Sequence, residues 1–178
     1  RGFPMNWLSL VFVLHIISPL WPLGPNPLPG DPFIIINKQE NELYYYEDEQ
    51  ELMRFSVATG KEAGDTPEGL FTIVTKFTDP EYSAKRIPAN SPRNPLGSRW
   101  MGIDARETNG RVYGIHGTNR EDSIGKHISN GCIRMKNEDA ERLFTHAPLA
   151  TKVYIYSGDE DPLIFAIKYG AVSKAAKP

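Results

Sequence analysis

The sequence predicts a mostly β domain built from short strands, with one main α-helix near residues 137–146. The 178-residue chain contains 15 glycines and 15 prolines, which interrupt it too often for many long helices. Runs of aromatic and β-branched residues alternate with turn residues, which is typical of antiparallel strands. Because 40% of the residues are hydrophobic, the chain can enclose one core.

The first half of the domain is expected to form a meander of strands. Four apolar or aromatic runs predict these strands, at residues 33–36, 43–46, 52–59 and 70–75. Thr66-Pro67-Glu68-Gly69 is the turn that leads into the last of them. Residues 79–98 carry four prolines and many polar residues, so they predict a long loop of the kind that often acts as a lid.

The second half contains the clearest helix signal. Strands are predicted at 100–103, 112–116 and 151–156. Between the last two, apolar residues recur three and four positions apart, at Ala140, Leu143, Phe144 and Ala147, which predicts a helix with one buried stripe. Asn137 is expected to cap this helix. The segment 162–169 is apolar, but it does not predict one type of element.

The N-terminal part differs from the rest. Residues 2–30 contain no Asp, Glu, Lys or Arg, and residues 7–17 are almost continuously apolar. This run is shorter than the ~20 residues of a membrane-spanning helix but fits the apolar region of an export signal; a buried helix is the alternative. The prolines that follow predict an extended connector. We therefore expect three parts: an export or anchor segment with its connector (1–31), a globular domain (32–157) and a C-terminal extension (158–178).

Charge and cysteine content narrow the classes of function. The net charge of −2 shows no basic excess, so no nucleic-acid partner is expected. Cys132 is the only cysteine, so it cannot form an internal disulfide. A thiol that cannot serve as a cross-link, in a chain that also offers a histidine base, is a candidate nucleophile.

That histidine is His116, sixteen residues before Cys132. If both segments are strands, alternation turns Ile133 into the core and Cys132 and Arg134 to the opposite face. The same alternation separates His116 from the core residue Ile115. Two neighbouring strand ends would then present His116, Cys132 and Arg134 to a common cleft.

These residue types suit acyl transfer. Contact between a thiol and an imidazole favours a thiolate–imidazolium pair, and His116 can later pass the proton to a leaving amine. Backbone N–H groups around Gly131 and Cys132 can hold an oxyanion, and Arg134 can clamp a substrate carboxylate. Since no acidic residue near His116 stands out, we expect the Gly117 carbonyl to orient the imidazole.

Simpler explanations apply to each residue taken alone. A lone cysteine is most often an inert buried side chain, and a lone arginine is most often a solvated charge. A zinc site from Cys132, His116 and His127 is another alternative. One cysteine without paired-ligand spacing is a poor match for zinc, so no metal is expected.

The combined motifs resemble the L,D-transpeptidase catalytic domain, the YkuD-type family. Its histidine motif stands here as His116-Gly117-Thr118, and its cysteine motif as the run from Ser129 to Asn137. Thr66-Pro67-Glu68-Gly69 also resembles the family's Thr-Pro-x-Gly turn. The resemblance covers about residues 32–157. Many members have histidine where this chain has Asn130, which we expect to alter a substrate contact rather than to remove activity.

This resemblance implies an L,D-transpeptidase-type β-sandwich and an enzyme that acts on peptidoglycan stem peptides. The implied catalytic residues are Cys132, His116 and Gly117, and the implied substrate-binding residues are Ser129, Asn130, Gly131 and Arg134. Cys132 would release the terminal D-alanine of a tetrapeptide, form a thioester and pass the acyl group to an acceptor amine. No cofactor is implied, and carbapenems would acylate the cysteine. The protein is expected in the cell envelope, secreted or anchored at the outer face of the cytoplasmic membrane.

Three other functions stay open at this point. The same nucleophile would serve a peptidoglycan L,D-carboxypeptidase or endopeptidase, in which water resolves the thioester. Acceptor access would decide between transfer and hydrolysis, and we expect the 79–98 loop to control it. The chain could instead be a non-catalytic cell-wall-binding module, or a structural exported domain with a buried thiol.

Overall fold

The computed structural model describes residues 26–174. Its strands are β1 (Phe33–Asn37), β2 (Glu42–Glu47), β3 (Gln50–Ser56), β4 (Thr59–Gly60), β5 (Gly69–Thr78), β6 (Arg99–Ile103), β7 (Tyr113–His116), β8 (His127–Ser129), β9 (Ile133–Arg134) and β10 (Lys152–Tyr156). Its helices are α1 (Asn137–His146) and α2 (Pro162–Tyr169), with single 3₁₀ turns at Ser83–Lys85, Ala105–Glu107 and Glu121–Ser123.

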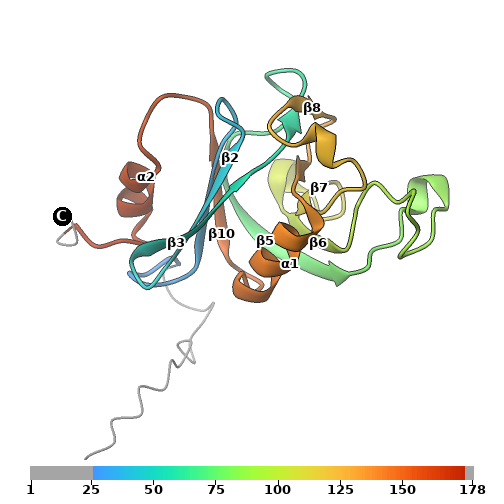
Figure 1. Cartoon of the computed structure of the whole chain (residues 1–178). Coiled ribbons are helices and arrows are strands. Elements are labelled where there is room, and N and C mark those ends of the chain that lie inside the picture. Colours follow the sequence, from blue (N-terminus) through green and yellow to red (C-terminus); the bar gives the residue numbers. More distant parts are fainter. Residues whose placement is uncertain (1–25, 175–178) are drawn as a thin grey trace, which may run out of the picture.

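Most strands join one curled sheet, shown in Figure 1. The strand order of this eight-stranded sheet is β3-β2-β1-β10-β5-β6-β7-β9, and β4 and β8 form a separate pair. The prediction of a mostly β domain is confirmed. The antiparallel meander of β1, β2 and β3 is present, but β10 inserts between β1 and β5 and runs parallel to β1.

The sequence predicts a single strand over 52–59, and here the structure differs. The β2–β3 pairing ends at Ser56, and Val57 N–H makes one last hydrogen bond to the Asn41 carbonyl at 2.8 Å. Ala58 then exchanges two backbone hydrogen bonds of 2.9 Å with Arg134. The break therefore brings the end of this run beside the segment that carries the cysteine.

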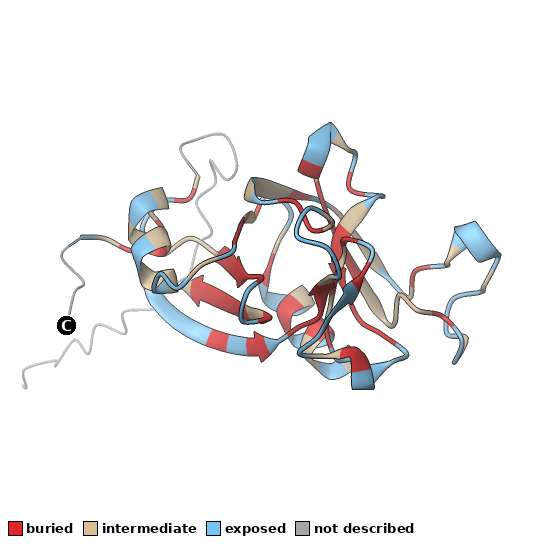
Figure 2. Ribbon diagram, turned by 90° about the horizontal axis from the view of Figure 1, so that it is seen from above, coloured by how far each residue is buried: buried red, intermediate tan, exposed pale blue. Residues whose placement is uncertain are grey.

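Both faces at the centre of the sheet are covered. On one face α1 packs over β6 and β7, and on the other α2 packs over β1. All five residues of β1 are buried as a result. Ile34 and Ile36 belong to the main core, whereas Phe33 and Ile35 belong to the second cluster, which includes residues of α2. Figure 2 shows the buried residues concentrated in this central sheet.

Helix α1 lies where the sequence predicts it, but the predicted cap is wrong. Lys136 occupies the N-cap position without a side-chain cap bond. The Asn137 side chain instead accepts a hydrogen bond from Ser98 N–H and donates one to the Thr118 carbonyl, both at 3.1 Å. It thus ties the base of the 79–98 loop to the residues that follow His116.

The ambiguous segment 162–169 forms α2. Asp161 caps it by accepting from Leu163 N–H at 2.9 Å, Pro162 starts its first turn, and Gly170 ends it at a φ of 93°. The ring of Phe165 packs on Tyr154 with centroids 4.7 Å apart. These aromatic contacts hold the helix on the sheet face opposite α1.

The predicted apolar segment 7–17 lies outside the described residues. The end of the proline-rich stretch is described, and it contacts the domain. The Asn26 side-chain amide donates to the Ala150 carbonyl at 2.9 Å, and Gly30 N–H donates to the Ala171 carbonyl at 3.0 Å. Within residues 26–174, no helix has the length and apolar character that crossing a membrane requires.

Candidate active site

The strand that carries His116 and the segment that carries Cys132 lie side by side. β7 and β9 pair in parallel, with Ile115 opposite Ile133 and His116 opposite Arg134. Both isoleucines are fully buried in the main core. Alternation therefore turns His116, Arg134 and Cys132 to the opposite face, and the predicted pairing of these strands is confirmed.

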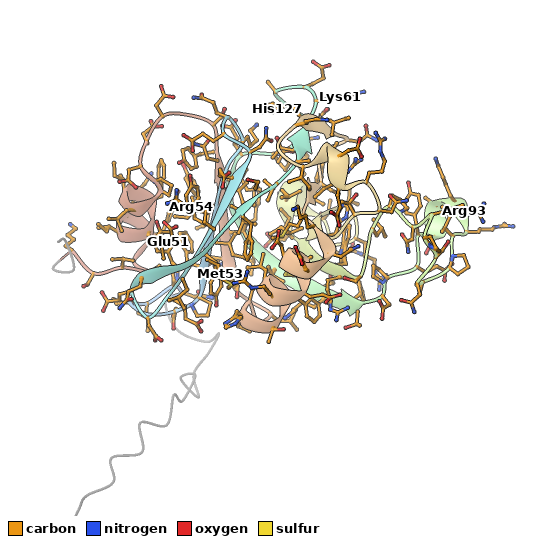
Figure 3. The ribbon with its side chains drawn as sticks, viewed as in Figure 1. Glu51, Met53, Arg54, Lys61, Arg93 and His127 are labelled. Carbon is orange, nitrogen blue, oxygen red and sulfur yellow. The ribbon has the colours of Figure 1, made fainter. Side chains whose placement is uncertain are left out.

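A cavity of about 530 Å³ opens on that face. Cys132, His116 and Arg134 line it, and so do Ser129 and Asn130. The 79–98 loop supplies another part of its wall, through residues Pro80, Glu81, Tyr82, Ser83, Ala84, Pro95 and Leu96. Figure 1 shows this loop reaching out beyond the sheet, and Figure 3 shows Arg93 toward its outer end.

The His116 ring is fixed by a carbonyl and an indole. Its Nδ1 lies 2.5 Å from the Gly117 carbonyl oxygen, so the predicted contact is present. Because a carbonyl oxygen only accepts, Nδ1 carries the proton and Nε2 keeps the lone pair. Trp100 lies opposite His116 across the β6–β7 pair, and the two rings stack with centroids 5.4 Å apart. Only 3% of His116 is exposed.

The thiol and the imidazole are both shifted toward their neutral forms. Burial raises the pKa of Cys132, although the Gly114 backbone and the Arg134 charge oppose this shift. Burial also lowers the pKa of His116 to about 4. The thiol of Cys132 accordingly donates to the Val112 carbonyl at 3.4 Å. Both shifts favour a neutral thiol and a neutral imidazole over the expected thiolate–imidazolium pair in the substrate-free protein.

These shifts predict a particular pH dependence. Because the pKa of His116 is lowered to about 4, its base form persists at neutral pH, and acylation of Cys132 should decline only as the pH falls toward about 4. Because the pKa of Cys132 is raised, alkylation by iodoacetamide should keep accelerating above pH ~8.5, the usual thiol pKa. Rate constants for acylation and for alkylation, measured from pH 4 to 11, test the expected decline at low pH and the expected rise at high pH. A plateau of alkylation that begins below pH 7 would instead show an ion pair.

Ser129 shapes the turn that precedes the nucleophile. Its hydroxyl accepts from Gly131 N–H at 3.0 Å and donates to the Cys132 carbonyl at 2.6 Å. The Gly131 N–H is therefore engaged within the turn. The β7–β9 pairing begins at Ile133, so the Cys132 N–H lies outside that ladder. Of the two N–H groups expected to hold an oxyanion, that of Cys132 is the better placed.

The other histidine of the zinc alternative lies elsewhere. His127 is exposed on β8, where the Asn41 amide nitrogen lies 3.2 Å from its Nδ1. Across the part of the chain that the structure describes, no group of three or more His, Cys, Asp or Glu side chains could hold a metal ion.

Two residues of the site could not be found from sequence reasoning. Trp100 stacks on His116, and Val112 accepts from the thiol, but both lie in runs that only predict strands. The register of β6 against β7 places Trp100 opposite His116, and no local signal in the sequence gives that register.

Comparisons with known proteins agree with this geometry. Residues 31–155 match the model of the L,D-transpeptidase catalytic domain, YkuD. The chain is 50% identical over 165 residues to YqjB of Bacillus subtilis (strain 168), provisionally named an L,D-transpeptidase, and the match covers 93% of this chain and 94% of YqjB. It is 36% identical over 141 residues to ErfK/SrfK of Escherichia coli (strain K12), named a probable L,D-transpeptidase. This match covers 68% of this chain and 43% of ErfK/SrfK.

The fold agrees as well. The NMR structure of the catalytic domain from the E. faecium L,D-transpeptidase acylated by ertapenem superposes with a TM-score of 0.53 at 25% identity. The match covers 71% of this chain and 97% of that one. Motif, fold and relatives thus lead to one conclusion: this chain belongs to the L,D-transpeptidase catalytic domain family of enzymes.

Proposed function

We propose that this protein is a cysteine-dependent L,D-transpeptidase of peptidoglycan stem peptides. The observation that carries the proposal is the placement of His116 on β7 and of Cys132 directly before the paired strand β9, both lining one cavity. A neutral imidazole that keeps its Nε2 lone pair is a competent base, and a thiol is a competent nucleophile once it is deprotonated.

The first half of the reaction forms a thioester. His116 Nε2 takes the thiol proton as Cys132 Sγ attacks the carbonyl carbon between the third residue of the stem and the terminal D-alanine. The Cys132 N–H stabilises the oxyanion that develops. The C–N bond then breaks, and the imidazolium returns the proton to the leaving amine of D-alanine.

The second half transfers the acyl group. An amine of a neighbouring stem attacks the thioester carbon, and His116 takes the proton of that amine. The C–S bond breaks and the proton returns to Cys132 Sγ, so the site is restored. A carbapenem would enter the same path as an acyl donor and remain on Cys132. The ertapenem-acylated form of the E. faecium catalytic domain supports this expectation.

Arg134 is proposed to clamp a substrate carboxylate. It lines the cavity beside His116 and offers a planar fork of N–H donors. Arg134→Ala should raise KM by roughly 10–100-fold, since a hydrogen bond to a charged group contributes about 1.5–3 kcal/mol. Arg134→Lys keeps the charge but loses the fork of donors, so its KM should lie between those of the wild-type protein and the alanine variant. Steady-state kinetics on a tetrapeptide stem give kcat and KM. An unchanged KM in the alanine variant would exclude the clamp.

One experiment separates transfer from its alternatives. The purified protein is incubated with tetrapeptide stems, and the products are identified by mass spectrometry. A cross-linked dimer with free D-alanine supports the transpeptidase. Tripeptide with D-alanine and no dimer would indicate an L,D-carboxypeptidase, and stem binding without any product would indicate a wall-binding module.

We also propose that the protein works in the cell envelope, exported or held at the outer face of the cytoplasmic membrane. The uncharged run from residue 2 to 30, with its apolar core at 7–17, supports this location. Fractionation of cells that express the full chain tests it. Recovery in the cytoplasm alone would contradict the proposal.

A further inference from the structure

The turn that connects β4 to β5 packs directly against the nucleophile segment. Lys61 N–H donates to the Ser129 carbonyl at 3.1 Å. A side chain on Gly131, which has a φ of +124°, would place its Cβ 2.6 Å from the Asp65 carbonyl oxygen. The turn therefore lies against the backbone just before Cys132. In Figure 3, Lys61 marks the start of this turn close to His127 of β8.

Thr66 makes the central contact of this packing. It is 1% exposed, and its hydroxyl oxygen accepts from Gly60 N–H at 2.8 Å. The same hydroxyl donates to the Gly131 carbonyl at 3.0 Å. The direction of both bonds is fixed, since an N–H group can only donate and a carbonyl oxygen can only accept.

A buried lysine holds the turn in this position. Lys38 is 8% exposed. Its ammonium group donates to the Ala63 carbonyl at 2.7 Å and to the Thr66 carbonyl at 3.0 Å, and it lies 2.9 Å from the Glu68 carboxylate. Three acceptors thus surround an ammonium group that has three donors.

We propose that Thr66, held by Lys38, is a positioning residue that aims the Cys132 N–H at the developing oxyanion. The peptide between Gly131 and Cys132 is planar, so its C=O and its N–H point in opposite directions when the bond is trans. The Thr66 hydroxyl fixes the direction of the C=O and therefore that of the N–H. This inference rests on the proposed function, because an oxyanion forms only if Cys132 is acylated.

The test compares two reactions of one thiol. Acylation by ertapenem passes through a tetrahedral oxyanion, whereas alkylation by iodoacetamide needs only the reactive sulfur. Thr66→Val removes the hydroxyl at nearly constant shape. It should slow acylation by roughly 10–100-fold, less than the ~10²–10³-fold expected for loss of an oxyanion donor. Alkylation should stay within about twofold of the wild-type rate, since the sulfur itself is unchanged.

Two further variants complete the design. Thr66→Ser keeps the hydroxyl and should retain most of the acylation rate. Lys38→Met keeps the Thr66 hydroxyl but releases the turn, so it should slow acylation selectively as well, and it decides the question if Thr66→Val does not fold. Wild-type acylation by Thr66→Val, an equal loss in Thr66→Ser, or a parallel loss of alkylation would each overturn the proposal. Failure of the wild-type protein to be acylated at Cys132 would instead count against the proposed function.

Discussion

Replacing Cys132 with alanine is expected to abolish the release of D-alanine from a tetrapeptide stem. Cys132 is the only cysteine of the chain, so no second thiol can replace it. Its Sγ lines the cavity together with His116, whereas the hydroxyl of the neighbouring Ser129 is engaged by the turn itself. Without the sulfur no thioester can form, and neither tripeptide nor dimer should appear in the product mixture.

The fold of this variant should be intact, because Cys132 is not a member of the main core cluster and its thiol donates to the Val112 carbonyl rather than to a core side chain. Circular dichroism and thermal unfolding provide that control. Turnover near the wild-type rate in a folded Cys132→Ala protein would show that the nucleophile lies elsewhere.

His116→Ala is expected to slow acylation of Cys132 by about 10²–10⁴-fold, the usual contribution of a general base. In the proposed mechanism the neutral imidazole is the base, and burial lowers the pKa of His116 so that this form persists at neutral pH. The difference in acylation rate between the wild-type protein and this variant should shrink at alkaline pH, where the thiol ionises without a base. Stopped-flow measurement of ertapenem acylation between pH 6 and 10 gives the ratio of the wild-type rate to the His116→Ala rate at each pH.

His116→Gln is the matched control for the orientation of the ring. A glutamine can donate a hydrogen bond as His116 does to Gly117, but it cannot accept the thiol proton. It should therefore be as slow as the alanine variant. A glutamine variant that acylates at the wild-type rate would mean that His116 serves packing against Trp100 and that another group is the base.

Much of the site follows from local pattern. Period-two alternation around Ile115 and Ile133 predicts which side chains leave the core, and both are buried as that pattern requires. The apolar stripe of α1 likewise predicts the helix and its buried face. These features can be predicted because they depend only on the period of a strand or helix and on which of its faces meets the core.

The rest depends on contacts between segments far apart in the sequence. No pattern within residues 151–156 indicates that β10 inserts between β1 and β5. Asn137 has the residue type of a cap, yet its side chain bonds Ser98 and Thr118, because the loop folds back onto the start of α1. The pKa shifts of the thiol and the imidazole also follow from burial, which the sequence does not display.

Mapping a carbapenem adduct is the most direct test of Cys132 as the nucleophile, because the adduct forms without any acyl acceptor. The full chain is treated with ertapenem at neutral pH, digested and analysed by tandem mass spectrometry. We expect one adduct per chain, on the peptide that contains Cys132, and none after prior alkylation with iodoacetamide. An unmodified Cys132, or an adduct on another residue, would contradict the proposed mechanism.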